Sequence, residues 1–176
     1  MASVLTGFRP VKHLTGAPYT GQLNRYMISA SDTAVTNVGD LVVLSDNAAL
    51  VDGDQGVYPA VERAGSGTAA AIVGVVVGFE VDYSNLNTGN YRAASTRRVA
   101  LVADSPDLIF AAPQDAVGGV VAAASVGLNV AVNLGTAVSV APWNSGMSVD
   151  SSTVATTNTL PLKIMGVTAS PDQDVT

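Results

Sequence analysis

The sequence predicts an all-β protein, built as a single β-barrel or a jelly-roll-like sandwich with at most one short helix. Three apolar segments, at residues 39–44, 71–81 and 98–110, carry this prediction. Val, Ile and Phe crowd these segments, while Gly, Asp, Asn, Ser and Pro separate them, which is typical of short strands joined by turns. A chain of 176 residues is long enough to bury one real core.

The N-terminal residues 1–27 are expected to form an extended arm ahead of a β-rich domain at 28–167. Gly and Pro recur every few residues there, so neither a helical nor a strand period survives. The aromatic side chains of Phe8, Tyr19 and Tyr26 lie between them and could anchor the arm on another molecule. The alternative is a tail that packs on its own domain.

The first half of the domain reads as short strands separated by turns. A strand at 41–44 follows the turn at 38–40, and a second strand at 48–51, which ends at a turn at 52–56, could pair with it as a hairpin. Residues 60–63 are expected to form a brief strand.

The strongest predicted strand covers residues 70–81. Gly74 and Gly78 lie inside it, which argues against a helix and indicates β-bulges or the close approach of a neighbouring backbone. A polar, turn-rich surface loop follows at 82–96, and loops of this length often contact partners.

The second half of the domain continues the pattern. A strand at 97–103, a tight turn at 104–107 and a paired strand at 108–112 come first. One helical turn is allowed within 117–126, because Ala is a good helix former. The remaining expectations are strands at 128–132, 135–141 and 160–167, a Ser- and Thr-rich loop or polar face at 148–159, and a tail at 168–176.

The composition predicts a protein that is packed against others. Charged residues make up only 12% of the chain, apolar residues make up 48%, and the mean hydropathy is +0.35. Such a chain would struggle to cover a monomer with charge, so we expect an oligomer or a component of an assembly. The longest apolar run, at 69–79, is far shorter than the roughly 20 residues of a membrane-spanning helix, so no membrane partner is expected.

Several further partners and compartments are disfavoured. The net charge is −6, and the eight basic residues are dispersed apart from Arg97 and Arg98, so direct binding of nucleic acid is not expected. Residues 1–15 have no apolar segment of the kind found in secretory signals, which indicates synthesis in the cytoplasm. The absence of cysteine fits a reducing compartment.

The sequence predicts neither an enzymatic activity nor a bound cofactor. His13 is the single histidine and lies in the expected arm. The sequence around Ser125 lacks the first Gly of a nucleophile elbow, and no histidine follows it. The acidic run that begins at Asp52 has Arg63 where a calcium loop requires Glu. Asp104 and Asp107 are expected to bond the backbone amides of their own turn.

A small set of aromatic and arginine side chains is left as candidate contacts with partners. Arg97 and Arg98 point to opposite faces of a strand, so one of them at most should serve a given contact. Trp143 is either a lid over the end of the barrel or an anchor in an interface. The candidate interface residues are Phe8, Arg9, Tyr19, Tyr26, Tyr83, Tyr91, Arg97 and Trp143.

The chain resembles the small head-decoration, or cement, proteins of tailed bacteriophages. The likeness covers most of the chain in order and rests on GFRPVKHLTGAPYTGQLNRYMI at 7–28, on SVGLN at 125–129, and on the segments 39–44, 72–79, 98–110 and 160–167. The resemblance implies a β-rich, jelly-roll or barrel-like protein that sits on the outer surface of the virion as a homodimer or homotrimer. It also implies that the partner is the major capsid protein, whose subunits the protein would bridge and reinforce.

Two other kinds of protein share these features. Another virion component without enzymatic activity, such as a minor capsid or tail subunit, is close to the first expectation. A pilus or adhesin-type β-subunit would have similar strands and low charge, but it should carry a secretion signal. Receptor or carbohydrate binding by exposed loops also stays open.

Overall fold

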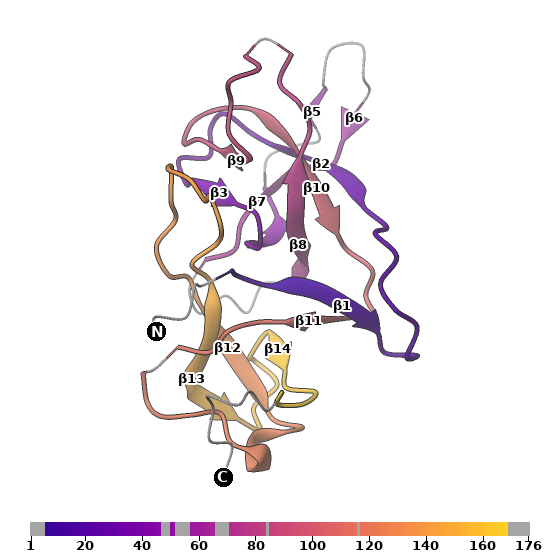
Figure 1. The fold of residues 1–176 in the computed structure, drawn as a ribbon, viewed down its shortest axis with the longest axis vertical. Helices are drawn as coiled ribbons and strands as arrows, with labels where there is room; N and C mark the ends of the chain where they lie inside the picture. The colour runs from indigo at the N-terminus through magenta and orange to yellow at the C-terminus, as the bar shows by residue number, and fades with distance from the viewer. Residues whose placement is uncertain are drawn as a thin grey trace.

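In a computed structural model of the chain, the described residues contain fourteen short strands and almost no other regular structure, which confirms the all-β class (Figure 1). The structure describes residues 6–46, 50–51, 57–65, 71–83, 85–115 and 117–168. The expected turn at 52–56 and nearly all of the expected C-terminal tail lie outside this part of the chain. The elements are β1 Arg9–His13, β2 Asn24–Ile28, β3 Thr36–Asn37, β4 Leu41–Leu44, β5 Leu50–Val51, β6 Val57–Tyr58, β7 Val61–Arg63, β8 Ile72–Phe79, β9 Tyr91–Arg92, β10 Arg98–Ala103, β11 Leu108–Ala111, a 3₁₀ turn Ala123–Ser125, β12 Asn129–Asn133, β13 Ser148–Ala155 and β14 Leu162–Lys163.

An antiparallel five-stranded sheet in the order β2-β10-β8-β4-β7 forms the main body. Its two edge strands, β2 and β7, approach one another at one point. There the backbone N–H of Met27 in β2 donates to the carbonyl of Pro59, just before β7, at 3.0 Å. The edges meet at this bridge alone, so among the described strands no sheet closes into a complete barrel. The arrangement is consistent with a β-sandwich.

Two further strand groups lie against this sheet. Strands β1 and β11 pair with each other and cross the middle of the molecule, between the five-stranded sheet and a three-stranded sheet of order β13-β12-β14 (Figure 1). The pairs β3-β9 and β5-β6 lie at the opposite end of the molecule from the three-stranded sheet.

Both faces of the five-stranded sheet are buried, which explains why its strands are nearly continuous runs of apolar residues. In β4, Val42 belongs to one buried cluster with Val76 of β8, whereas its neighbours Leu41 and Val43 belong to another cluster with Val75. This alternation follows from the two-residue period of a strand. A third, smaller cluster of Val121, Val130 and Ile164 supports the three-stranded sheet.

Residues 6–27 of the segment expected to be an extended arm are part of the domain, which agrees with the alternative interpretation. It contributes β1 and β2, and Phe8 is only 3% exposed, in the cluster between the sheets. Gly7 allows the chain to bring Phe8 into this cluster, since Gly7 has φ +64° and a Cβ in its place would clash with the side chain of Ser145. Phe8 is therefore a core residue and not an exposed anchor.

Two expected hairpins are wrong. Strand β11 pairs with β1 rather than with β10, because both edges of β10 are already taken by β2 and β8. Strand β4 likewise has β7 and β8 as neighbours, so β5 pairs with β6 instead.

In the C-terminal third, one expected strand is absent, and a segment expected to be a loop or a polar face contains a strand. Residues 135–141 form no strand, because Asn37 takes the place of a strand partner: its side chain bonds both the N–H and the carbonyl of Val138, at 3.0 and 2.7 Å. The Ser- and Thr-rich segment instead contains β13, where Asp115 accepts hydrogen bonds from the backbone N–H and the hydroxyl of Ser151. Of the expected strand at 160–167, only β14 is formed.

Candidate functional site

The most deeply buried polar cluster of the described residues surrounds Asp40. Its carboxylate accepts hydrogen bonds from the backbone N–H of Asn37 at 2.8 Å and from the hydroxyl of Ser145 at 2.5 Å, and it pairs with Nε of Arg63 at 2.9 Å. Arg63 also donates to the carbonyl of Leu134. The contacts of Ser145 and Arg63 join the five-stranded sheet to the connection between β12 and β13, so the cluster is structural.

Two more arginines, Arg92 and Arg98, make hydrogen bonds within the protein. The guanidinium of Arg92 is fully buried and donates to the carbonyls of Ser29, Asp32, Ala34 and Thr96. Burial lowers the pKa of Arg92, and the nearby Asp32 opposes that shift.

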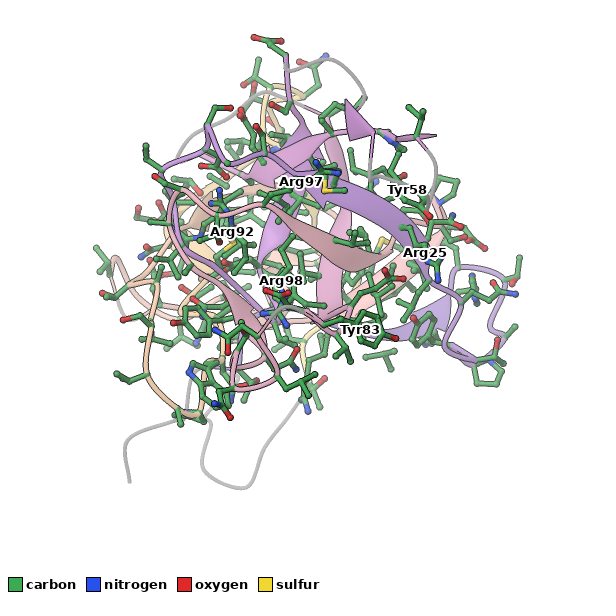
Figure 2. The ribbon with its side chains drawn as sticks, turned by 90° about the horizontal axis from the view of Figure 1, so that it is seen from above. Arg25, Tyr58, Tyr83, Arg92, Arg97 and Arg98 are labelled. Atoms are coloured by element: carbon green, nitrogen blue, oxygen red, sulfur yellow. The ribbon has the colours of Figure 1, made fainter. Side chains whose placement is uncertain are left out.

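Arg98 lies 5.0 Å over the ring of Phe79 and donates to the carbonyls of Gly89 and Tyr91. Its neighbour Arg97 is exposed and lies just before β10, which begins at Arg98 and not at residue 97 as expected. Arg92, Arg97 and Arg98 are labelled in Figure 2.

Exposed apolar side chains gather on one loop after β8, which we call the Tyr83 loop (residues 81–83 and 85–90). Tyr83 is 89% exposed and Leu86 is 75% exposed, and Val81 is exposed as well. Backbone turns at Asp82–Asn85 and Asn85–Thr88 shape the loop. Large apolar groups this exposed are costly in water and often mark contact surfaces.

The base of the Tyr83 loop is held firmly. The ring of Trp143 stacks on Tyr91 with centroids 6.1 Å apart and planes 13° apart. It also lies directly over Gly89, where a Cβ would come within 2.7 Å of the indole. Together with the hydrogen bonds from Arg98, these contacts fix the loop while its tip stays exposed.

A second feature is an open trough along the outside of β2, which we call the β2 trough. It consists of two hollows of about 610 and 500 Å³ that share Leu23 and Asn24. Tyr19 and Asp104 line the first hollow, and Tyr26 and Tyr58 line the second.

Hydrogen bonds orient the polar groups of the trough. The carboxylate of Asp104 accepts from the amide of Asn24 at 3.0 Å and from the hydroxyl of Tyr26 at 2.7 Å. Burial, followed by this bond and the charge of Asp104, raises the pKa of Tyr26 to about 12. Burial and the same charge also raise the pKa of Tyr19. The expectation that Asp104 bonds its own turn is wrong, because its carboxylate reaches across to β2.

Arg25 is fixed at the far end of the trough. Its Nε lies 2.6 Å from the carboxylate of Glu80, and a terminal nitrogen donates to the hydroxyl of Tyr58 at 3.3 Å. Arg25 and Tyr58 are neighbours in Figure 2. The guanidinium is exposed but held in one orientation.

His13, Ser105 and Asp107 come together at the first hollow, which His13 and Ser105 help to line, and their geometry is not that of a catalytic triad. Nδ1 of His13 lies 2.9 Å from Oδ1 of Asp107, and the hydroxyl of Ser105 donates to the same oxygen at 2.6 Å. A serine nucleophile needs its base within hydrogen-bond reach, and here the hydroxyl is bonded to the carboxylate instead. The hydrogen bonds from Ser105 and His13 lower the pKa of Asp107.

The other candidate chemistries find no support in the described part of the chain. It contains no group of three or more His, Cys, Asp or Glu side chains placed to hold a metal ion. No helix within the same residues has the length and apolar character needed to cross a membrane.

The structure sorts the sequence candidates into separate places. Tyr19 and Tyr26 meet in the β2 trough, Tyr91 and Trp143 meet under the Tyr83 loop, and Arg9 is exposed on β1. Nothing local to Tyr58, Asn24 or Arg25 indicates that these residues line one hollow, so the sequence does not single them out.

Comparison of the chain with protein-family models, with curated proteins and with solved structures found no match in any of the three.

Proposed function

We propose that the protein is a structural component of a virus particle, a head-decoration protein that binds the outer capsid surface and reinforces contacts between major capsid protein subunits. The observation that carries the proposal is the Tyr83 loop, which presents Tyr83 and Leu86 almost fully exposed on a rigid base. Tyrosine and other large apolar groups contribute much of the binding energy at protein interfaces.

The rigidity of the loop base favours a binding role. Ordering a loop on association costs conformational entropy, and a loop already held by Arg98 and Trp143 avoids much of that cost. The low charged fraction of 12% supports extended contact with protein surfaces, because charge is depleted at the centre of such interfaces.

Many copies of a modest contact suffice for reinforcement. A ligand that binds only the assembled shell stabilises it by mass action, and copies linked as a dimer or trimer gain further from their high effective concentration. We therefore expect the chain to form a homodimer or homotrimer and to add stability to expanded capsids.

The experiment is co-sedimentation of the purified protein with expanded capsids of the virus that encodes it. Tyr83→Ser and Leu86→Ser should each weaken binding at least about tenfold, which corresponds to roughly 1.4 kcal/mol. Met165→Ser, which changes an exposed apolar residue outside the loop, is the matched control and should bind like the wild type. Wild-type protein that does not bind capsids, or loop variants that bind as well as the control, would refute the proposal.

A further inference from the structure

The β2 trough offers a second binding surface, one that the proposed decoration role does not use. Its two hollows, of about 610 and 500 Å³, join at Leu23 and Asn24 and each falls within the size range of ligand sites. Both hollows are open to solvent beside β2 and share Leu23 and Asn24, so an elongated ligand could lie across them.

Aromatic rings from separate segments line the trough. Tyr19 follows β1, Tyr26 belongs to β2, and Tyr58 belongs to β6. A tyrosine ring offers an apolar face of fixed orientation at a low cost in side-chain entropy. The hydroxyls of Tyr19 and Tyr26 donate to the carbonyl of Gln22 and to Asp104, and the hydroxyl of Tyr58 accepts from Arg25. Such faces suit ligands that have flat patches of C–H groups.

Between the rings lie polar groups that are already oriented. Asp104 is held by Asn24 and Tyr26, and Arg25 is held by Tyr58 and Glu80. A carboxylate can accept about four hydrogen bonds, so Asp104 keeps acceptor capacity, and Arg25 keeps free donors among its five N–H groups. The trough therefore presents fixed acceptors and fixed donors side by side.

The charge and polarity of the trough select the class of ligand. The cation Arg25 is balanced by Asp104 and Glu80, so a polyanion would meet repulsion from the carboxylates. The polar lining does not suit a lipid chain. Hydroxyl groups are both donors and acceptors, and sugar rings combine them with C–H faces.

We propose that the β2 trough binds a neutral oligosaccharide, with Tyr19, Tyr26 and Tyr58 against its ring faces and with Asp104, Asn24 and Arg25 bonded to its hydroxyls. This inference does not rest on capsid binding, because the trough is complete within one chain.

The test is a titration of the ¹⁵N-labelled protein, followed by NMR, with maltotriose and with triacetylchitotriose. A heparin tetrasaccharide serves as the anionic probe. At least one neutral sugar should give saturable shift changes centred on the side-chain amide of Asn24, with a dissociation constant of about 1 mM, as suits an open and shallow site. No saturable binding by either neutral sugar, or tighter binding of the heparin fragment, would overturn the proposal.

Variants locate the site. Tyr58→Ala removes a ring and Asn24→Ala removes an exposed amide, and each should weaken sugar binding at least about fivefold, close to 1 kcal/mol. Val140→Ser, an exposed residue outside the trough, should leave the affinity unchanged. The fluorescence of Trp143 reports whether each variant is folded. Unchanged affinity in both folded trough variants would also overturn the assignment.

Discussion

Replacement of Asp40 by alanine tests whether the buried polar cluster joins the two parts of the fold. The carboxylate is 0% exposed and accepts from the N–H of Asn37, the hydroxyl of Ser145 and Nε of Arg63. Alanine leaves all three donors in place without their acceptor. The largest loss of stability is expected from Arg63, because its side chain is only 10% exposed and its charge would have no partner carboxylate.

The size of the effect follows from these contacts. Breaking a buried ion pair by removing one partner costs about 3–5 kcal/mol, and each buried neutral donor left unsatisfied costs about 1–3 kcal/mol. The contributions share one acceptor and are not additive, so we expect a loss of about 5 kcal/mol in the free energy of unfolding. Such a loss is a large part of the total stability of a typical domain, which is about 5–15 kcal/mol.

Urea unfolding monitored by Trp143 fluorescence and by circular dichroism measures this loss. With a slope of about 2 kcal/mol per molar urea, the midpoint should fall by roughly 2.5 M. Asp46→Ala is the matched control, because Asp46 is exposed, and it should change stability by less than about 0.5 kcal/mol.

A double-mutant cycle separates the ion pair from the rest of the cluster. Adding Arg63→Met to Asp40→Ala removes the unpaired charge, so the double variant should be more stable than Asp40→Ala alone. The reasoning is refuted if Asp40→Ala loses less than about 2 kcal/mol, or if the two substitutions are strictly additive.

Three further predictions concern single positions. Gly74→Ala should lower the free energy of unfolding by about 1–3 kcal/mol and the melting temperature by several degrees, because the new Cβ would overlap the carbonyl oxygen of Ala103. Gly78→Ala on the same strand is the control, since its Cβ meets no atom within 4 Å and the change should be nearly neutral. Equal melting temperatures for the two variants would contradict the geometry. Arg92→Lys should lower the free energy of unfolding, measured in urea, by about 2–4 kcal/mol, because an ammonium group cannot reach all the carbonyls that the planar guanidinium bonds. Arg97→Lys is the control and should have little effect. Similar urea midpoints for the two variants would disprove the role of the guanidinium. Burial raises the pKa of Asp115, but the hydrogen bonds from Asn133 and Ser151 outweigh burial and bring the pKa below 3.8. The contribution of Asp115 to the stability of the fold is therefore complete above that pH, and it is lost as the pH falls through the lower pKa of the folded state. Urea midpoints measured between about pH 6 and 2 should therefore fall more steeply at the acid end for the wild type than for Asp115→Asn, and parallel curves would count against this assignment.

The sequence alone determined the local features of the fold. The apolar runs that form β4, β8 and β10 were predicted, because the residues of a strand themselves show which of its side chains are buried. The close approach at Gly74 was predicted for the same reason: a missing side chain is visible without knowledge of the neighbour. Gly78 lies beside the register irregularity between β8 and β10, as a bulge requires.

Only the tertiary structure decided which segments meet. Strand β11 could not be assigned to β1 from the sequence, because that pairing depends on both edges of β10 being occupied. Strand β13 was missed because its hydroxyl-rich residues bond to Asp115, a partner that no local pattern reveals.

The candidate surfaces divide in the same way. The exposure of Tyr83 agrees with the surface loop predicted at 82–96. The end of that segment does not agree, because Tyr91 and Arg92 form β9 and the guanidinium of Arg92 is buried among backbone carbonyls. The β2 trough was not predicted, because its lining comes from distant segments: Tyr19 precedes β2, Tyr58 belongs to β6 and Asp104 follows β10. Burial and exposure are local properties of a sequence, whereas the neighbours of a side chain are set by long-range packing.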